Sequence, residues 1–216
     1  DTLKLEELLY GATLFKDKET KAAIYAKATK VAPKCTRAHN NLGAVKFAMG
    51  DLEAAKASFT KAKDIKDTDI VNNNLGAVAL AEGDVEKAKE LFTAALGAGE
   101  KPNYNLGIIS IIEGDYGAAI NYFGATPSYN AALAKYLNDD GNGAWTTIVN
   151  LHEESPYKNY LTAVVAASQD KPEVVYENLK NALAVCQKPD MLKDRAKNDL
   201  EFAKLWEEDA FKAIVE

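Results

Sequence analysis

An eleven-residue segment occurs three times along the chain, in similar form and at nearly equal spacing. It reads NLGAVKFAMGD from Asn41, NLGAVALAEGD from Asn74 and NLGIISIIEGD from Asn105, so successive copies begin 33 and then 31 residues apart. Recurrence at such a period is typical of a repeat architecture, in which each unit buries its apolar face against its neighbours. We therefore expect a linear array of similar units.

Each position that stays constant between copies has a structural reason. In the first copy these positions are Gly43, Gly50-Asp51, Ala55 and Phe59. A glycine inside a helix costs about 1 kcal/mol relative to alanine, so its repetition predicts a helix contact too close for a side chain. Gly-Asp predicts a turn between two helices, with the glycine just after the first helix and the aspartate as N-cap of the second. The alanine and phenylalanine lie four residues apart, on one face of the second helix.

Weaker copies extend the pattern on both sides, and we expect about six helix pairs in all. Their predicted bounds are 2–31, 35–65, 68–97, 101–124, 127–151 and 156–187. The tail at 190–216 has helical periodicity and is expected to close the array as a C-terminal capping helix. Its predicted inward-facing residues are Met191, Leu192, Ala196, Leu200, Phe202 and Leu205.

The Leu-Gly and Ala-x3-Phe-x2-Ala positions resemble the tetratricopeptide repeat (TPR) family over about residues 37–126. The aromatic positions depart from the family, since His39, Asn72 and Asn103 stand where it often has tryptophan. The resemblance implies an all-α, right-handed TPR-like α-solenoid, and we expect residues 1–216 to form one domain. The resemblance and the composition favour a bacterial protein of the cell envelope, periplasmic or associated with the outer membrane, while a cytoplasmic location stays open.

The resemblance also implies a binding groove. In the family, the first helices of the repeats line the concave face, and peptide contacts come mainly from positions one and three residues before the aligned glycine and one, four and five after it. An asparagine also stands two residues before this position in four copies. The predicted groove residues are Asn41, Phe47, Asn74, Leu80, Tyr104, Asn105, Ile108, Ile111, Tyr129, Asn130 and Tyr136.

Two readings of this groove stay open. The stripe is nearly all apolar, and a large exposed apolar patch usually marks a binding site, here one suited to an amphipathic helix or a hydrophobic segment. Alternatively, the superhelix is tight and these side chains fill its own interior. The asparagines likewise can bind a peptide backbone or a neighbouring helix. Ala44 and Ala77 replace the asparagine of the family's carboxylate clamp, and its basic residues are absent, so chaperone C-termini are not expected partners.

Composition and charge limit the other functions. The net charge of −6 argues against nucleic acid as a partner, and no apolar run is long enough to span a bilayer. Cys35 and Cys186 lie more than four repeats apart and are expected to be free, buried thiols. His39 is expected to be a partly buried structural histidine. The stretch NDDGNG at 138–143 lacks the closing glutamate of a calcium loop and predicts a polar turn.

Together these observations favour a non-enzymatic scaffold that holds a protein or peptide segment on an apolar concave surface. We expect no catalytic residues, no metal and no cofactor, because no nucleophile motif or phosphate-binding loop is present. The alternative is a structural spacer or docking module of a larger protein, with no free peptide ligand. The chain begins at Asp1 without a methionine, so a removed signal, another domain or a cloning cut stay open, as does the oligomeric state.

Overall fold

The computed structural model describes residues 2–152 and 155–216, and within these residues it contains helices and no strand. Contacts group the chain into two compact units, Asp1–Ile109 and Ser110–Glu216. Each unit is described by itself. The expectation of one continuous domain over 1–216 stays a prediction.

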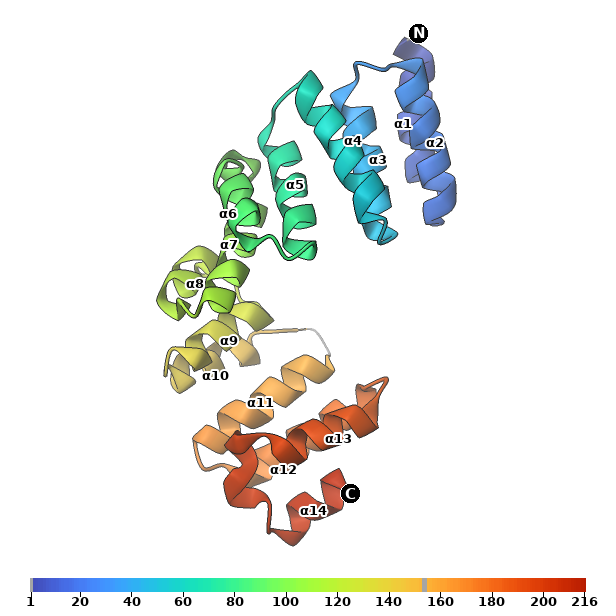
Figure 1. The fold of residues 1–216 in the computed structure, drawn as a ribbon. Helices are drawn as coiled ribbons and strands as arrows, with labels where there is room; N and C mark the ends of the chain where they lie inside the picture. The colour runs from blue at the N-terminus through green and yellow to red at the C-terminus, as the bar shows by residue number, and fades with distance from the viewer. Residues whose placement is uncertain (1, 153–154) are drawn as a thin grey trace. The chain divides into compact units, whose positions relative to one another are not determined.

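The first unit consists of antiparallel helix pairs joined by short turns (Figure 1). Its helices pack in chain order, α1 on α2, α2 on α3, α3 on α4 and onward to α6. They are α1 (Thr2–Thr13), α2 (Lys18–Val31), α3 (Thr36–Ala48), α4 (Leu52–Ile65), α5 (Asp69–Ala81), α6 (Val85–Thr93), the 3-10 turn η1 (Leu96–Ala98) and the first part of α7 (Glu100–Glu113).

The second unit continues the helix-pair pattern and ends in a differently folded tail (Figure 1). Its elements after α7 are α8 (Tyr116–Phe123), α9 (Tyr129–Leu137), α10 (Gly141–Val149), α11 (Pro156–Ser168), α12 (Pro172–Val185), α13 (Pro189–Asn198), the 3-10 helix η2 (Leu200–Leu205) and α14 (Asp209–Val215). The predicted pairs agree with these bounds to within a few residues.

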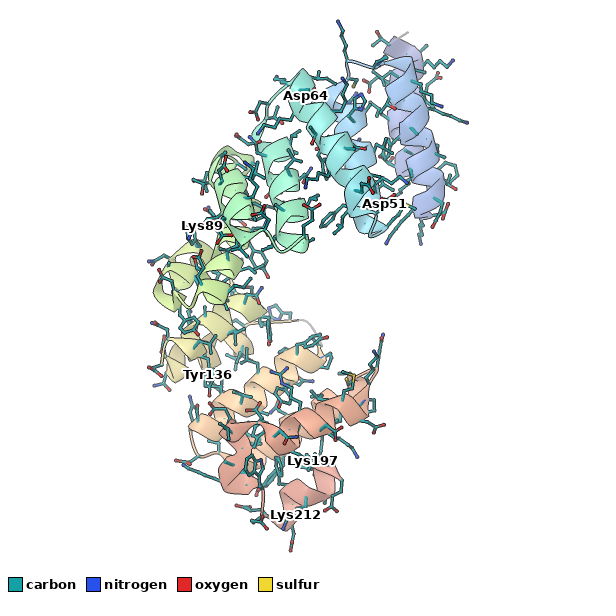
Figure 2. The ribbon with its side chains drawn as sticks, in the orientation of Figure 1. Asp51, Asp64, Lys89, Tyr136, Lys197 and Lys212 are labelled. Carbon is teal, nitrogen blue, oxygen red and sulfur yellow. The ribbon has the colours of Figure 1, made fainter. Side chains whose placement is uncertain are left out.

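The repeated Gly-Asp forms the turn within each pair, as predicted. Gly50 has a φ of 81°, a left-handed conformation that a side chain disfavours, and it lies just before the helix that follows. Asp51 lies in the same turn (Figure 2), and its carboxylate accepts from the backbone N–H of Ala54 at 3.2 Å. This capping bond satisfies one of the free N–H groups at the start of α4.

The glycine inside each first helix packs directly against the phenylalanine of the second. A Cβ atom built on Gly43 would lie 2.6 Å from Cδ1 of Phe59, and one on Gly76 would lie 2.7 Å from Cε1 of Phe92. Both phenylalanines are buried. The sequence-based prediction of a helix contact with no space for a side chain is therefore confirmed for these two repeats.

The tail packs on the last repeat through a core of three aromatic rings. Phe202 is fully buried, and its ring centroid lies 5.7 Å from that of Tyr160 and 5.8 Å from that of Phe211. Around these rings, the other buried side chains come from α11, α12, α13 and α14. The segment predicted as one capping helix therefore folds as two α-helices linked by a 3-10 helix.

Two residues of the tail were placed wrongly from the sequence. Met191 and Leu200, which were expected to face inward, are exposed. Leu192 and Ala196, one turn apart, occupy the inner face of α13 instead. Met191 comes one residue before Leu192, so it lies on a different side of the helix. Leu200 begins η2, where the change from α-helix to 3-10 helix alters which residues face the core.

A tyrosine–carboxylate bond links the tail to α12 and gives it a pH dependence. The hydroxyl of Tyr176 donates to Oε2 of Glu208 at 2.7 Å, and burial together with this bond raises the pKa of Tyr176 to about 12. Between pH 10 and 12 the folded state therefore keeps a proton that the unfolded state loses, so stability falls as pH rises. In urea unfolding, we expect the stability advantage of wild type over Tyr176→Phe to shrink from pH 10 to 12. A constant advantage across that window would contradict this assignment.

Candidate functional site

The predicted groove residues divide between the two units. Residues from Asn41 to Ile108 belong to the first unit, on α3, α5 and the start of α7, whereas Ile111, Tyr129, Asn130 and Tyr136 belong to the second. We use the name first-helix face for the predicted groove residues of the first unit together with their neighbours on the same sides of α3, α5 and α7. It comprises Asn40, Asn41, Ala44, Phe47, Ile70, Asn73, Asn74, Leu80, Ala81, Tyr104, Asn105 and Ile108.

Side chains on the first-helix face remain accessible. All of the predicted groove residues, in either unit, are half-buried or exposed. Ala44 and Ala81 are exposed, and Ile70 and Tyr104 project from the face with exposed fractions of 60% and 40%. These side chains are therefore not buried in the interior of the first unit, and the binding groove stays a prediction.

Phe47 has two roles on this face. It is half-buried, and it packs against the core cluster of Ala55, Phe59 and Val78. A charged substitution there would disturb the helix packing as well as the surface. Phe47 is consequently a poor position for testing binding, whereas the exposed alanines of the same face are good ones.

Asparagine pairs connect successive repeats across the first-helix face. Nδ2 of Asn74 on α5 donates to Oδ1 of Asn40 on α3 at 2.8 Å. One repeat later, Nδ2 of Asn105 on α7 donates to Oδ1 of Asn73 on α5 at 3.2 Å. The predicted asparagines Asn74 and Asn105 therefore hydrogen-bond to a neighbouring helix, which is one of the two roles that the sequence left open.

Each asparagine pair leaves one side-chain donor and one side-chain acceptor available to a ligand. Within the described residues, no protein group accepts a hydrogen bond from Nδ2 of Asn40 or Asn73, and none donates to Oδ1 of Asn74 or Asn105. The second pair also borders a cavity of about 320 Å³, lined by Asn73, Glu100, Lys101, Tyr104 and Asn105. Because the pair fixes both amides, it presents a donor and an acceptor in a set orientation.

Asn40 and Asn73, the accepting members of the pairs, were not predicted from the sequence. The signal was available, since the dipeptide Asn-Asn precedes Leu-Gly at the same 33-residue spacing in both copies. The predicted groove contains only the second asparagine of each dipeptide. The half-buried Asn41 has no equivalent partner and makes no side-chain hydrogen bond within the described residues.

The second unit places its predicted residues in different surroundings. Tyr136 lies at the end of α9 (Figure 2) and lines a polar cavity of about 550 Å³ together with Asp139, Gln169 and Glu201. Burial raises the pKa of Tyr136 well above its ordinary value, and a hydrogen bond with Glu201 raises it further. Tyr129 lies at the start of α9, where its ring meets that of Tyr157 edge to face at 6.5 Å. These neighbours were not predicted.

Several other predicted residues have structural roles. Nε2 of the half-buried His39 lies 3.0 Å from the carbonyl oxygen of Pro33, as expected for a structural histidine. NDDGNG forms the turn between α9 and α10, where Asp140 accepts from the backbone N–H of Gly143 at 2.8 Å. Cys35 and Cys186 are free thiols, but each is half-buried rather than buried.

Within the described parts of the chain, histidine, cysteine and acidic side chains form no group suited to holding a metal ion. None of the helices in residues 2–152 and 155–216 has the length and apolar character needed to cross a membrane. The first-helix face offers groups for hydrogen bonding and apolar contact.

Comparison with known proteins agrees with the repeat pattern. Residues 36–69 match the family model of the tetratricopeptide repeat, which corresponds to α3, α4 and the turn that follows. No curated protein matches the sequence.

Three solved structures resemble this chain. pilF of Pseudomonas aeruginosa has a TM-score of 0.74 at 15% identity, over 94% of this chain and 96% of its own. PilW, a widely conserved type IV pilus biogenesis factor, has a TM-score of 0.71 at 18% identity, over 100% and 98%. A chain of the APC/C hetero-tetramer Cut9-Hcn1 has a TM-score of 0.71 at 15% identity, and this chain spans 40% of its length. At such identities the likeness shows the fold alone.

Proposed function

The chain carries a tetratricopeptide repeat at residues 36–69 and has the fold of tetratricopeptide repeat proteins, and from this premise we propose that it is a non-enzymatic scaffold that holds a protein segment on its first-helix face. The fold supports a role in protein–protein interaction in general terms. The particular face and the kind of segment are our proposal.

The observation that carries the proposal is the pair of asparagine contacts. Asn40 and Asn73 each present an unused Nδ2 donor, and Asn74 and Asn105 each present an unused Oδ1 acceptor. The peptide backbone carries one donor and one acceptor per residue, and both need partners when they leave water. A helix satisfies these groups internally, whereas an extended segment does not. The paired amides therefore suit an extended partner segment better than an amphipathic helix.

Apolar contact supplies the rest of the proposed interaction. Leu80 and Ile108 are half-buried and Ile70 is mostly exposed, so the face offers aliphatic surface beside the asparagines. Burying apolar surface contributes about 25 cal/mol per Å². We infer that aliphatic side chains of the partner lie against these residues while its backbone bonds to the amides.

The proposal can be tested by placing bulk on this face without touching the core. Ala44→Arg and Ala81→Arg add a long charged side chain at exposed positions of α3 and α5. We expect both variants to lose a partner captured by the immobilised wild-type chain from extracts of the source organism and identified by mass spectrometry. The loss is expected because the added side chain occupies the surface that the segment needs.

The matched control is Ala57→Arg, which makes the same change at an exposed alanine on the second helix α4. It should capture the same partners as the wild type, and all three variants should keep wild-type helical circular dichroism. If the face is only a spacer between domains, Ala44→Arg and Ala81→Arg will capture the same proteins as the control, and the proposal fails.

A further inference from the structure

Three tyrosines and one arginine gather in the second unit, from helices far apart in the sequence. Tyr129 comes from α9, Tyr157 and Tyr160 from α11, and Arg195 from α13. The rings of Tyr129 and Tyr157 meet edge to face at 6.5 Å, and the guanidinium carbon of Arg195 lies 4.8 Å from the ring centroid of Tyr160. The packing of the tail thus places a cation beside an aromatic cluster.

The position of Arg195 is fixed through Tyr160. The hydroxyl of Tyr160 donates to Oδ2 of Asp199 at 2.9 Å, and the other oxygen of Asp199 accepts from the backbone N–H of Glu201 at 3.2 Å. Tyr160 is also buried, so its ring cannot turn away. A guanidinium stacked on a fixed ring loses little conformational freedom when it binds a ligand.

The cluster has groups that no described residue uses. The phenols of Tyr129 and Tyr157 make no hydrogen bond with any described side chain. Arg195 hydrogen-bonds with the hydroxyl of Tyr160 and makes no ion pair with a described side chain, so the other donors of its guanidinium stay available. Tyr157 and Tyr160 lie three residues apart on α11, so the contact with Tyr129 and the contact with Arg195 fall on one face of that helix. Burial raises the pKa of Tyr129, and the charge of Arg195 acts on it in the opposite direction. The Tyr157 ring, at 68% exposure, is open to a ligand.

We propose that Tyr129, Tyr157 and Arg195 form a site for a glutamate or aspartate side chain that lies next to an aliphatic residue in a partner segment. The guanidinium and the Tyr129 hydroxyl donate to the carboxylate, and the exposed Tyr157 ring packs against the aliphatic neighbour. Hydrogen bonds between ionised partners are shorter and stronger than neutral ones, so the carboxylate is the main determinant.

The surroundings favour an internal carboxylate over two related ligands. Tyr157 and Arg195 are both exposed, which suits a side chain presented by a continuous partner segment. Phosphate groups are usually held by clusters of arginines, whereas this site has one, with the carboxylate of Asp199 nearby. A doubly charged ligand is therefore disfavoured.

This inference rests on the proposed function, because Tyr129 is one of the predicted groove residues. The probe is an array of N-acetylated, C-amidated peptides in which a central glutamate is flanked by leucine, isoleucine or valine, each with a glutamine twin. Binding to the intact chain is measured by fluorescence anisotropy at low salt. We expect glutamate peptides to bind about tenfold or more tightly than their twins, as for a hydrogen bond to a charged group.

Variants identify the residues responsible. Arg195→Gln should abolish the preference for glutamate, and Tyr129→Phe, which removes only the hydroxyl, should reduce it. Lys197→Gln changes another exposed cation two residues along α13 (Figure 2) and should leave the preference intact. Tyr157→Ala should weaken all peptides, whereas Tyr10→Ala, at an equally exposed tyrosine of the first unit, should not.

The inference is overturned if no peptide binds, if the twins bind equally, or if Arg195→Gln keeps the preference. It is also overturned if phosphoserine peptides or peptides with a free C-terminus bind more tightly through Arg195. The proposed function fails separately, since its test uses Ala44→Arg and Ala81→Arg in the first unit. A partner lost by those variants but kept by Arg195→Gln would support the scaffold and reject this site.

Discussion

Replacing Gly76 with alanine is expected to lower the free energy of unfolding of Asp1–Ile109 by about 1–3 kcal/mol, the usual cost of overpacking a filled core. Alanine is favoured over glycine inside a helix by about 1 kcal/mol, so propensity alone predicts the opposite sign. Packing decides the outcome, because the new Cβ would lie 2.7 Å from Cε1 and 2.8 Å from Cδ1 of Phe92. Phe92 is fully buried, so its ring can move aside only by displacing other core side chains.

A matched control is available in the same unit. Gly11 lies inside α1, and a Cβ atom built on it meets nothing within 4 Å, so Gly11→Ala should leave stability unchanged or raise it by up to about 1 kcal/mol. The double variant Gly76→Ala, Phe92→Leu should recover part of the loss, since the smaller side chain yields space. Hydrogen exchange of α5 and α6 amides gives the local free energy. Equal stabilisation by Gly76→Ala and Gly11→Ala would show that the ring contact is not a constraint.

The contact between Gly76 and Phe92 also shows why the sequence predicts so much of this fold. A residue that is costly by itself recurs at the same place in each copy, and recurrence identifies it as a packing requirement. The Gly-Asp turns gave the bounds of the helix pairs for the same reason. Repetition supplies several instances of one local structure, so each copy predicts the same contact.

Where the repeat ends, the predictions become less accurate. The tail has helical periodicity but no second copy, so nothing in the sequence marks the change from α13 to the 3-10 helix η2. That change alters which residues face the core, and Leu200 consequently lies outside. Contacts such as that of Tyr160 with Asp199 join residues from non-repeating positions, which a periodic pattern cannot indicate.

The predicted groove residues are accessible, but their role in binding stays a prediction, and part of their chemistry was not predicted. The register of the glycines placed the groove residues on accessible surfaces in both units. The pairing of Asn74 with Asn40 depends on how far apart neighbouring repeats lie, and the sequence does not contain this distance. Leu80 and Ile108 have the apolar character expected of the whole face. The paired asparagines make the part of the face formed by the N-terminal halves of the helices polar.

The tail provides the second large expected effect. Phe202→Ala should lower the free energy of unfolding of Ser110–Glu216 by about 3–5 kcal/mol, the usual cost of removing a fully buried phenylalanine. The ring contacts both Tyr160 on α11 and Phe211 on α14, so its loss separates the tail from the last repeat as well as leaving a cavity. Leu200→Ala, in the same 3-10 helix but 79% exposed, should change stability by less than about 0.5 kcal/mol.

Hydrogen exchange can show where this loss falls. In Phe202→Ala, amides of α11 and α12 should exchange faster while those of α3 to α5 keep wild-type rates, because the contacts removed all belong to the second unit. If Phe202→Ala behaves like Leu200→Ala, the tail is not part of the core of this unit. The result also bears on the acidic-peptide site, since α13 holds Arg195 over Tyr160 only while the tail is docked. Phe202→Ala should therefore lose the preference for glutamate peptides without any change to Tyr129, Tyr157 or Arg195, whereas Leu200→Ala should keep it.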